Sequence, residues 1–306
     1  VFRPSLLKNQ KFENKDHPSL HVPPPVNIVQ FADDTQIWIT GKKQDLPQLV
    51  NQLETALQCM FDWFCDHGMK VNEAKTELML FGTTQMLRGI GDVRVHFNGA
   101  TVTSKDQVRN LGVTFDRNLN FGLHVDLLVP KCTGMLLALN QAKHVIPTAT
   151  VKYLITALVF PVMRYCMSVY GICNKTQVRR VQKLINFAAR IVSGRRRNDH
   201  ISDVVRSLGW LRADELVSYH RVLVIHRLIS RLIPLSLVQT IGAPARRQHD
   251  HDTRAAGLLT LPRIRTETGR KRLCYSAVKM YNDVPKVVGI SFKTAAKRYL
   301  RSVDEA

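Results

Sequence analysis

The first hydrophobic pattern in the chain is a pair of short β-prone runs separated by acidic residues. Residues 26–31 and 35–40, within "VNIVQFADDTQIWIT", are rich in Val, Ile, Phe, Trp and Thr, which favour strands. Ala32-Asp33-Asp34 lies between them, and Asp is common in turns. The pattern predicts a β-hairpin whose connection carries two adjacent carboxylates. Because the flanking runs are apolar and β-branched, we expect this hairpin to lie in the core of a sheet.

The next pattern has a helical period. Apolar residues recur at intervals of three and four from about residue 46 to residue 64, which predicts a helix packed on one face of the sheet. Asp45 is a candidate N-cap, and Gly68 is expected to end the helix. "KVNEAK" (70–75) is expected to be a turn before a strand at "TELMLFG" (76–82).

Two further β patterns precede a change of periodicity. Asn98-Gly99 between β-prone runs predicts a tight hairpin, and "VRNLGVTFD" (108–116) predicts one more strand. From about residue 123 the pattern is helical, with candidate helices at 123–143, 149–168, 175–193, 201–209, 212–231 and 271–282. We therefore expect an α+β chain with an irregular leader at 1–25, a strand-rich domain at 26–120 and a helical domain at 121–306.

Charge divides the chain in the same way. Residues 1–120 carry 13 basic and 13 acidic residues, whereas the remainder carries 31 basic and 11 acidic residues. The whole formal excess of +20 therefore lies in the helical part. Such asymmetry favours a neutral module followed by a module that binds a polyanion, with nucleic acid as the expected partner; ordinary surface basicity is the alternative.

The cysteines and the apolar runs indicate the cellular compartment in which the protein is expected. The six cysteines form no C-x-x-C pair, so neither a zinc site nor a disulfide framework is expected. The most apolar stretch, residues 153–163, contains Pro161 and is too short to cross a bilayer. We expect an intracellular protein of the nucleus or cytoplasm, neither secreted nor membrane-spanning; its protein partners remain open.

Asp33 and Asp34 have two readings. Adjacent aspartates often serve only as the polar tip of a hairpin. However, no Lys or Arg lies between Lys15 and Lys42, so no neighbour in sequence neutralises the pair. A divalent cation would do so, and carboxylate oxygens suit Mg²⁺ or Mn²⁺. "HDHD" (249–252) also resembles a metal cluster, but its polar surroundings favour a solvated loop.

The order of the motifs favours the metal-binding interpretation of Asp33 and Asp34. "FADDT", then an amphipathic helix, "GMKVNEAKTELMLF" and "VRNLGVTFD" resemble the palm of reverse transcriptases of non-LTR, jockey-like retrotransposons. "RVQKLINFAARIVSG", "LGWLRADELVSYHRVLVIHRLI" and "LPRIRTETGRKRLCYSAVKMYNDVP" resemble the region that follows that palm. The resemblance implies a partial polymerase palm, an antiparallel hairpin with a packed helix, followed by a helical thumb and a C-terminal extension.

The resemblance also implies a reaction and its metal ligands. It implies RNA-templated DNA synthesis by two-metal phosphoryl transfer, with an RNA template, a DNA primer, deoxynucleotides and two Mg²⁺ or Mn²⁺ ions in the intact enzyme. By position, Asp33 and Asp34 are implied catalytic metal ligands. Lys75 is implied to act on the pyrophosphate, by proton transfer or by charge alone.

Other positions are implied to lie near primer or nucleotide. Phe31 stands beside the carboxylates as an aromatic residue against the primer end. Asn72 and Thr76 are expected to shape the turn that carries Lys75. Leu111 and Gly112 fall in the segment that grips the primer, where Gly permits close backbone approach, although Gly112 could equally mark a β-bulge.

The basic tail supplies the candidate nucleic-acid contacts. Arg195, Arg196 and Arg197 follow a predicted helix, where cations suit the helix dipole but also offer guanidinium groups to phosphates. Within that helix we expect further contacts from Arg179, Arg180 and Lys183.

The sequence departs from the resembled family before the aspartates. A third metal-binding carboxylate is expected on an earlier palm strand, yet Glu13 and Asp16 lie in a polar segment without a strand pattern. The finger region and the Gly- and Gln-containing segment are also missing. We therefore expect a C-terminal fragment that does not polymerise alone. The alternatives are a non-catalytic RNA- or DNA-binding remnant acting through the basic helices, and a decayed reading frame.

Overall fold

The computed structural model describes the backbone of residues 2–6 and, with side chains, residues 23–31, 34–230, 232, 258–264, 273–285 and 289–302. The chain divides into two compact units, Val1–Phe121 and Gly122–Ala306. Asp33 and the "HDHD" segment lie outside the described residues. The first unit contains the described strands and the second contains helices, so the expected mixed α+β class is confirmed.

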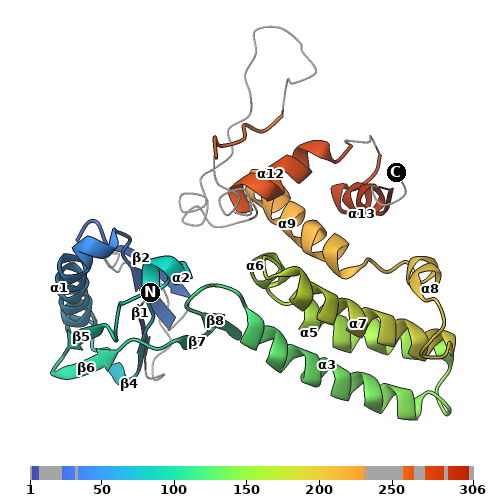
Figure 1. Cartoon of the computed structure of the whole chain (residues 1–306), viewed down its shortest axis with the longest axis horizontal. Helices are drawn as coiled ribbons and strands as arrows, with labels where there is room; N and C mark the ends of the chain where they lie inside the picture. Colours follow the sequence, from blue (N-terminus) through green and yellow to red (C-terminus); the bar gives the residue numbers. More distant parts are fainter. Residues whose placement is uncertain are drawn as a thin grey trace, which may run out of the picture. The chain divides into compact units, whose positions relative to one another are not determined.

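The first unit is built on a four-stranded antiparallel sheet (Figure 1). Its order is β2-β3-β1-β4, with strands β1 (Phe2–Leu6), β2 (Asn27–Phe31), β3 (Asp34–Trp38) and β4 (Val71–Leu78). The predicted hairpin is therefore present as β2–β3. Two expectations were wrong: residues 2–6 are a strand rather than part of an irregular leader, and β2 is an exposed edge strand rather than a core strand.

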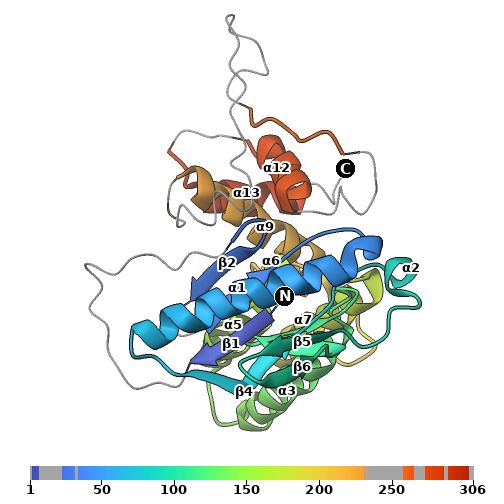
Figure 2. The ribbon, with the colours of Figure 1, turned by 90° about the vertical axis from the view of Figure 1, so that its left-hand side faces the viewer.

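Helix α1 (Leu46–Asp66) covers one face of this sheet, as Figures 1 and 2 show. Its apolar stripe buries Leu57, Met60 and Phe64 against Ile37 of β3 and the neighbouring strands. A one-turn 3₁₀ helix, η1 (Lys43–Asp45), leads into it. Asp45 occupies the N-cap position without a side-chain capping bond. Gly68 follows the helix with a positive φ of 67°.

Two small hairpins and a short helix, α2 (Thr84–Leu87), complete the unit. β5 (Arg94–Phe97) and β6 (Ala100–Thr103) are joined by Asn98-Gly99, both with positive φ, as that dipeptide predicts. The single strand expected at 108–116 was wrong. It is a second hairpin, β7 (Gln107–Asn110) and β8 (Val113–Asp116), which turns at Leu111-Gly112.

The second unit begins with α3 (Gly122–Ala142), which packs beside α7 (Lys175–Ser193). The predicted helix at 149–168 is interrupted: α4 (Thr148–Leu154), the π-helical η2 (Ile155–Val159), α5 (Phe160–Arg164) and α6 (Met167–Tyr170) follow one another. Cys166 adopts a left-handed conformation at the last break. Among the described helices, α3 alone is long and apolar enough to cross a membrane, a length-and-composition criterion that a soluble core helix also meets.

The remaining helices form a second core. α8 (Ser202–Ser207) precedes α9 (Ala213–Ile229), which packs against α12 (Leu273–Asp283) and α13 (Phe292–Ser302). Val222, Ile225, Val278 and Ala296 are buried where these three helices meet. The sequence pattern predicted the elements at α8, α9 and α12 but missed α13, whose polar and basic residues hide a short apolar face.

Candidate functional site

Phe31 and Asp34 face each other at the end of the β2–β3 hairpin. They are cross-strand partners, so Ala32 and Asp33 connect the strands between them. The Phe31 side chain is 65% exposed, whereas Asp34 is half-buried and precedes the fully buried Thr35. The hairpin therefore anchors Asp34 through Thr35 and leaves an aromatic ring in solvent beside it.

The sheet places Asn72 in the same row as Asp34. Ser5 of β1 pairs with Asp34 on one side and with Asn72 of β4 on the other. Because adjacent strands are about 4.8 Å apart, the Asp34 and Asn72 backbones lie about 10 Å from each other. Two sequence-predicted site residues, 38 positions apart in the chain, thus share one row of the sheet.

Asn72 organises an irregularity within β4. Its side-chain Oδ1 accepts a hydrogen bond from the Lys75 backbone N–H at 3.3 Å, and its carbonyl accepts from the Thr76 hydroxyl at 3.1 Å. The pairing of β4 with β1 shifts register over these residues. The prediction of a turn at residues 70–75 was therefore wrong. These residues belong to a strand that begins at Val71 and contains a bulge, with Lys75 exposed and Thr76 buried.

Leu111 and Gly112 are the turn of the β7–β8 hairpin, with φ values of 45° and 82°. The single extended strand expected here is absent, and Gly112 lies in a hairpin turn rather than in the β-bulge that was the alternative. The hairpin is attached to the main sheet by a 3.0 Å hydrogen bond from the Gln36 side-chain amide of β3 to the Asn110 side-chain oxygen. This bond connects the turn to the strand that carries Asp34.

The described part of the row carries side-chain oxygens. Asp34 supplies a carboxylate, and Asn72, two strands away, supplies an amide oxygen. Oxygen ligands are the type that hard cations such as Mg²⁺ prefer. The described residues, which exclude Asp33, contain no cluster of three His, Cys, Asp or Glu able to hold a metal. A site here therefore depends on the hairpin aspartates themselves.

The candidate nucleic-acid contacts divide into paired and unpaired cations. Arg195 donates to both carboxylate oxygens of Asp203, at 3.1 and 2.7 Å, and also to the His200 carbonyl. Arg180 pairs with Asp126. Their charges are therefore largely neutralised within the protein. The other candidates are exposed and form no ion pair with any described residue: Arg179, Lys183, Arg196 and Arg197.

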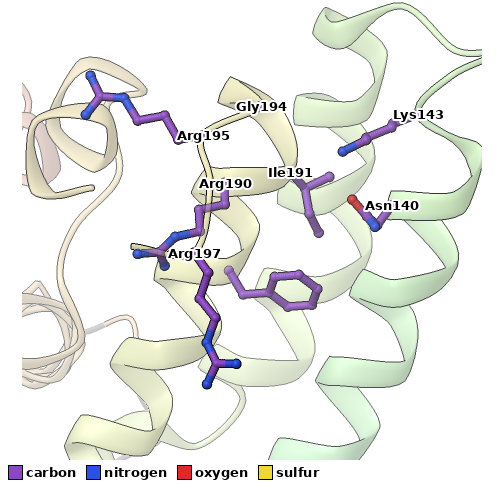
Figure 3. A pocket seen from close by; sticks show the side chains of 8 residues that line it. Asn140, Lys143, Arg190, Ile191, Gly194, Arg195 and Arg197 are labelled. Carbon is purple, nitrogen blue, oxygen red and sulfur yellow. The ribbon is translucent and has the colours of Figure 1, made fainter. Parts of the chain in front are cut away.

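A basic pocket lies where α3 and α7 end, and sequence reasoning identified only two of its residues (Figure 3). Its volume is about 400 Å³. The lining residues are Asn140, Lys143, Phe187, Arg190, Ile191, Gly194, Arg195 and Arg197. The charged residues Lys143 and Arg190 were missed because no local pattern reveals that two helix ends 50 residues apart meet.

A third group of basic side chains is partly buried in the second unit. The Nε atoms of Arg164 and Arg301 and the Nε2 of His220 are buried without a hydrogen-bond partner among the described residues. Burial, with Arg164 and Arg227 nearby, lowers the pKa of His220 to about 4. Burial, with Arg301 and Arg164 nearby, also lowers the pKa of Lys297. These groups raise the energy of any further positive charge placed among them.

Comparison with known proteins addresses the palm resemblance directly. Residues 7–115 match the family described as "Reverse transcriptase (RNA-dependent DNA polymerase)". The resemblance to retrotransposon reverse transcriptases is confirmed. The chain is 24% identical over 230 residues to the "RNA-directed DNA polymerase from mobile element jockey" of Drosophila funebris, an alignment that covers 72% of this chain and 24% of that protein.

Two further relatives extend the comparison. One is the "Retrovirus-related Pol polyprotein from type-1 retrotransposable element R1 3" of Nasonia vitripennis, 26% identical over 50% of this chain and 41% of the relative. The other is the "Probable RNA-directed DNA polymerase from transposon BS" of Drosophila melanogaster, 25% identical over 54% of this chain and 18% of the relative. The alignments thus span well under half the length of these proteins. No solved structure gives a significant match.

Proposed function

We propose that the first unit is part of a reverse-transcriptase palm whose hairpin holds divalent metal ions for RNA-templated DNA synthesis. The observation that carries the proposal is the hairpin end itself. Asp34, which follows Asp33 in the sequence, pairs with an exposed Phe31 and shares a sheet row with Asn72. The family match across residues 7–115 supports it. In this reading the second unit is the thumb with its C-terminal extension.

Each residue then has a role in the intact enzyme. Two bound Mg²⁺ or Mn²⁺ ions supply activation of the primer hydroxyl and stabilisation of the leaving pyrophosphate. Asp33 and Asp34 hold these ions, and Phe31 contacts the primer end. Lys75 projects from the Asn72 bulge as an exposed cation near phosphate charge, which it stabilises without needing a proton transfer.

The carboxylate set within these 306 residues is incomplete in this proposal. β1, the strand between β3 and β4, has the sequence FRPSL and carries no Asp or Glu. Two ions held by one pair of adjacent aspartates lack a third ligand on the neighbouring strand. We therefore expect this polypeptide alone not to extend a primer, and a longer polypeptide that supplies such a strand to do so.

Primer extension on an RNA template tests both statements. The 306-residue chain with Mg²⁺ and deoxynucleotides in excess is expected to give no product. Product from this chain would overturn the incompleteness. In an active longer polypeptide, Asp33→Asn and Asp34→Asn should each abolish extension, while the matched Asp92→Asn, at an exposed position outside the sheet, should not. Full activity of either hairpin variant would overturn the metal assignment.

A second candidate function, binding of nucleic acid without catalysis, has its own observation. Arg179 and Lys183 lie one helical turn apart on α7, and Arg196 and Arg197 follow the same helix, all exposed. Four phosphate contacts would give a salt slope of about −2.8 for single strands and about −3.6 for duplex DNA. Binding to the full chain should show such a slope and should survive Asp34→Asn. Absence of binding at low salt would remove this function.

A further inference from the structure

The pocket at the ends of α3 and α7 combines an apolar surface with cations. Phe187 and Ile191 are one turn apart on α7 and form its apolar part. Figure 3 shows Asn140 and Lys143 on the α3 side, with Arg190 and Arg197 on the other side of Ile191. A volume of about 400 Å³ is within the range of small-molecule sites and far exceeds what one free phosphate needs.

The charge of this pocket is positive after local neutralisation. None of its eight lining residues, all within the described part of the chain, is Asp or Glu. Asp203 neutralises Arg195, which leaves Lys143, Arg190 and Arg197. The carboxyl ends of α3 and α7 each add about half a negative charge. Three positive charges therefore exceed the helix-end charge, and an anion is favoured.

Arg190 is held in place before any ligand arrives. Its Nε donates to the Arg196 carbonyl at 3.1 Å, and its Nη2 donates to the Asp199 carbonyl at 3.2 Å. These acceptors are neutral, so the guanidinium keeps its full charge. Fixed orientation lowers the entropy that a ligand contact would otherwise cost. Helix-end stabilisation accounts for Arg190 itself but not for Arg197, which lies beyond the Gly194 cap and still lines the pocket.

We propose that this pocket binds one unpaired nucleotide of a single-stranded nucleic acid. The phosphates on either side of that nucleotide contact Lys143 on one side of the pocket and Arg197 on the other, and the base lies between them against Phe187 and Ile191. The Asn140 amide offers both a donor and an acceptor to the edge of the base. Aromatic stacking combined with backbone cations is the general means by which proteins hold single strands. The inference rests on the proposed nucleic-acid binding by the second unit and specifies where one base is held.

The test compares two oligonucleotides and two matched double variants of the full chain. The probes are a fluorescent ten-nucleotide oligothymidylate and a ten-unit abasic deoxyribose phosphate of equal charge. Lys143→Ala/Arg197→Ala removes two pocket cations. Arg179→Ala/Lys183→Ala removes two exposed α7 cations outside the pocket, so both variants lose the same charge. Circular dichroism verifies that each variant is folded.

The expected result is a base preference that depends on the pocket. The wild-type chain should bind oligothymidylate about tenfold more tightly than the abasic probe, the scale of one stacked base. The pocket variant should lose that ratio, whereas the control variant should keep it and weaken both probes equally. Phe187→Leu and, should that variant unfold, Asn140→Ala should reduce the ratio without changing the salt slope.

Two different failures are distinguishable. If the wild-type chain binds both probes equally, or if both double variants behave alike, the nucleotide pocket is wrong while nucleic-acid binding stands. If the wild-type chain binds neither probe at low salt, nucleic-acid binding by the second unit is wrong, and the pocket proposal falls with it.

Discussion

Phe31 and Asp34 are cross-strand partners in the β2–β3 hairpin, which places a 65% exposed aromatic ring directly opposite a half-buried carboxylate. An exposed Phe at the end of an edge strand contributes little to the core. In the proposed function this hairpin end receives a cation and a primer end. Binding of a cation there is testable without catalysis.

Asp34→Asn should reduce stabilisation by Mg²⁺. Saturating Mg²⁺ stabilises a chain that binds it only when folded, by about 2.7 kcal/mol at one hundred times Kd. In the absence of divalent ions, the stability of the same variant gives the baseline against which its Mg²⁺ response is measured. Thermal unfolding with and without MgCl₂ measures both effects. Asp92→Asn is the control, and an equal Mg²⁺ response in all three proteins would contradict a cation at the hairpin.

Asn72→Ala should destabilise the first unit by about 1 kcal/mol. The substitution removes the acceptor of the Lys75 N–H and with it the local bond that closes the β4 bulge. Lys75→Ala changes an exposed side chain in the same bulge and should stay within about 0.5 kcal/mol of the wild type. Urea unfolding of the two variants provides the comparison. Equal stabilities would show that Asn72 does not hold the bulge.

Local chemistry made much of the fold predictable. The β2–β3 hairpin, α1 and the Asn98-Gly99 turn follow from short-range signals: β-prone flanks, a helical period, and a dipeptide that readily adopts two positive φ values. Asp34 and Asn72, which share one row of the sheet, both occur in segments that the sequence pattern singles out.

What sequence reasoning missed depends on contacts between distant segments. β1 became a strand because it fills the space between β3 and β4, and its own sequence shows no such preference. Leu111-Gly112 lacks the polar first residue typical of tight hairpins, so the turn was interpreted as part of one strand. The pocket forms only because the ends of α3 and α7 lie side by side. The residue pattern within either helix does not predict that contact.

Gly112→Ala should destabilise the chain by about 1 to 2 kcal/mol. Its φ of 82° is in the left-handed region, where a Cβ clashes with the backbone. Gly91→Ala is a matched control, because its φ is ordinary and an added Cβ meets no atom within 4 Å. Chemical denaturation of both variants measures the difference. A Gly112 variant as stable as the Gly91 variant would contradict the β7–β8 turn.

His220 should make the second unit less stable as the pH falls. Burial and the nearby Arg164 and Arg227 lower its folded pKa to about 4, below the ordinary value of 6.5 that applies when the chain unfolds. Between pH 6.5 and pH 4 this histidine is therefore protonated in the unfolded state and neutral in the folded state. The stability present above pH 6.5 is lost on acidification. One such proton changes the free energy of unfolding by at most about 1.4 kcal/mol per pH unit, less for a partly exposed ring.

His220→Gln should flatten the dependence of the free energy of unfolding on pH between pH 7 and pH 5, a window above most carboxylate titrations. His144→Gln is the control, because that histidine is exposed. Unfolding in urea at several pH values supplies the slopes. An unchanged slope in His220→Gln would show that this histidine titrates as it does in the unfolded chain.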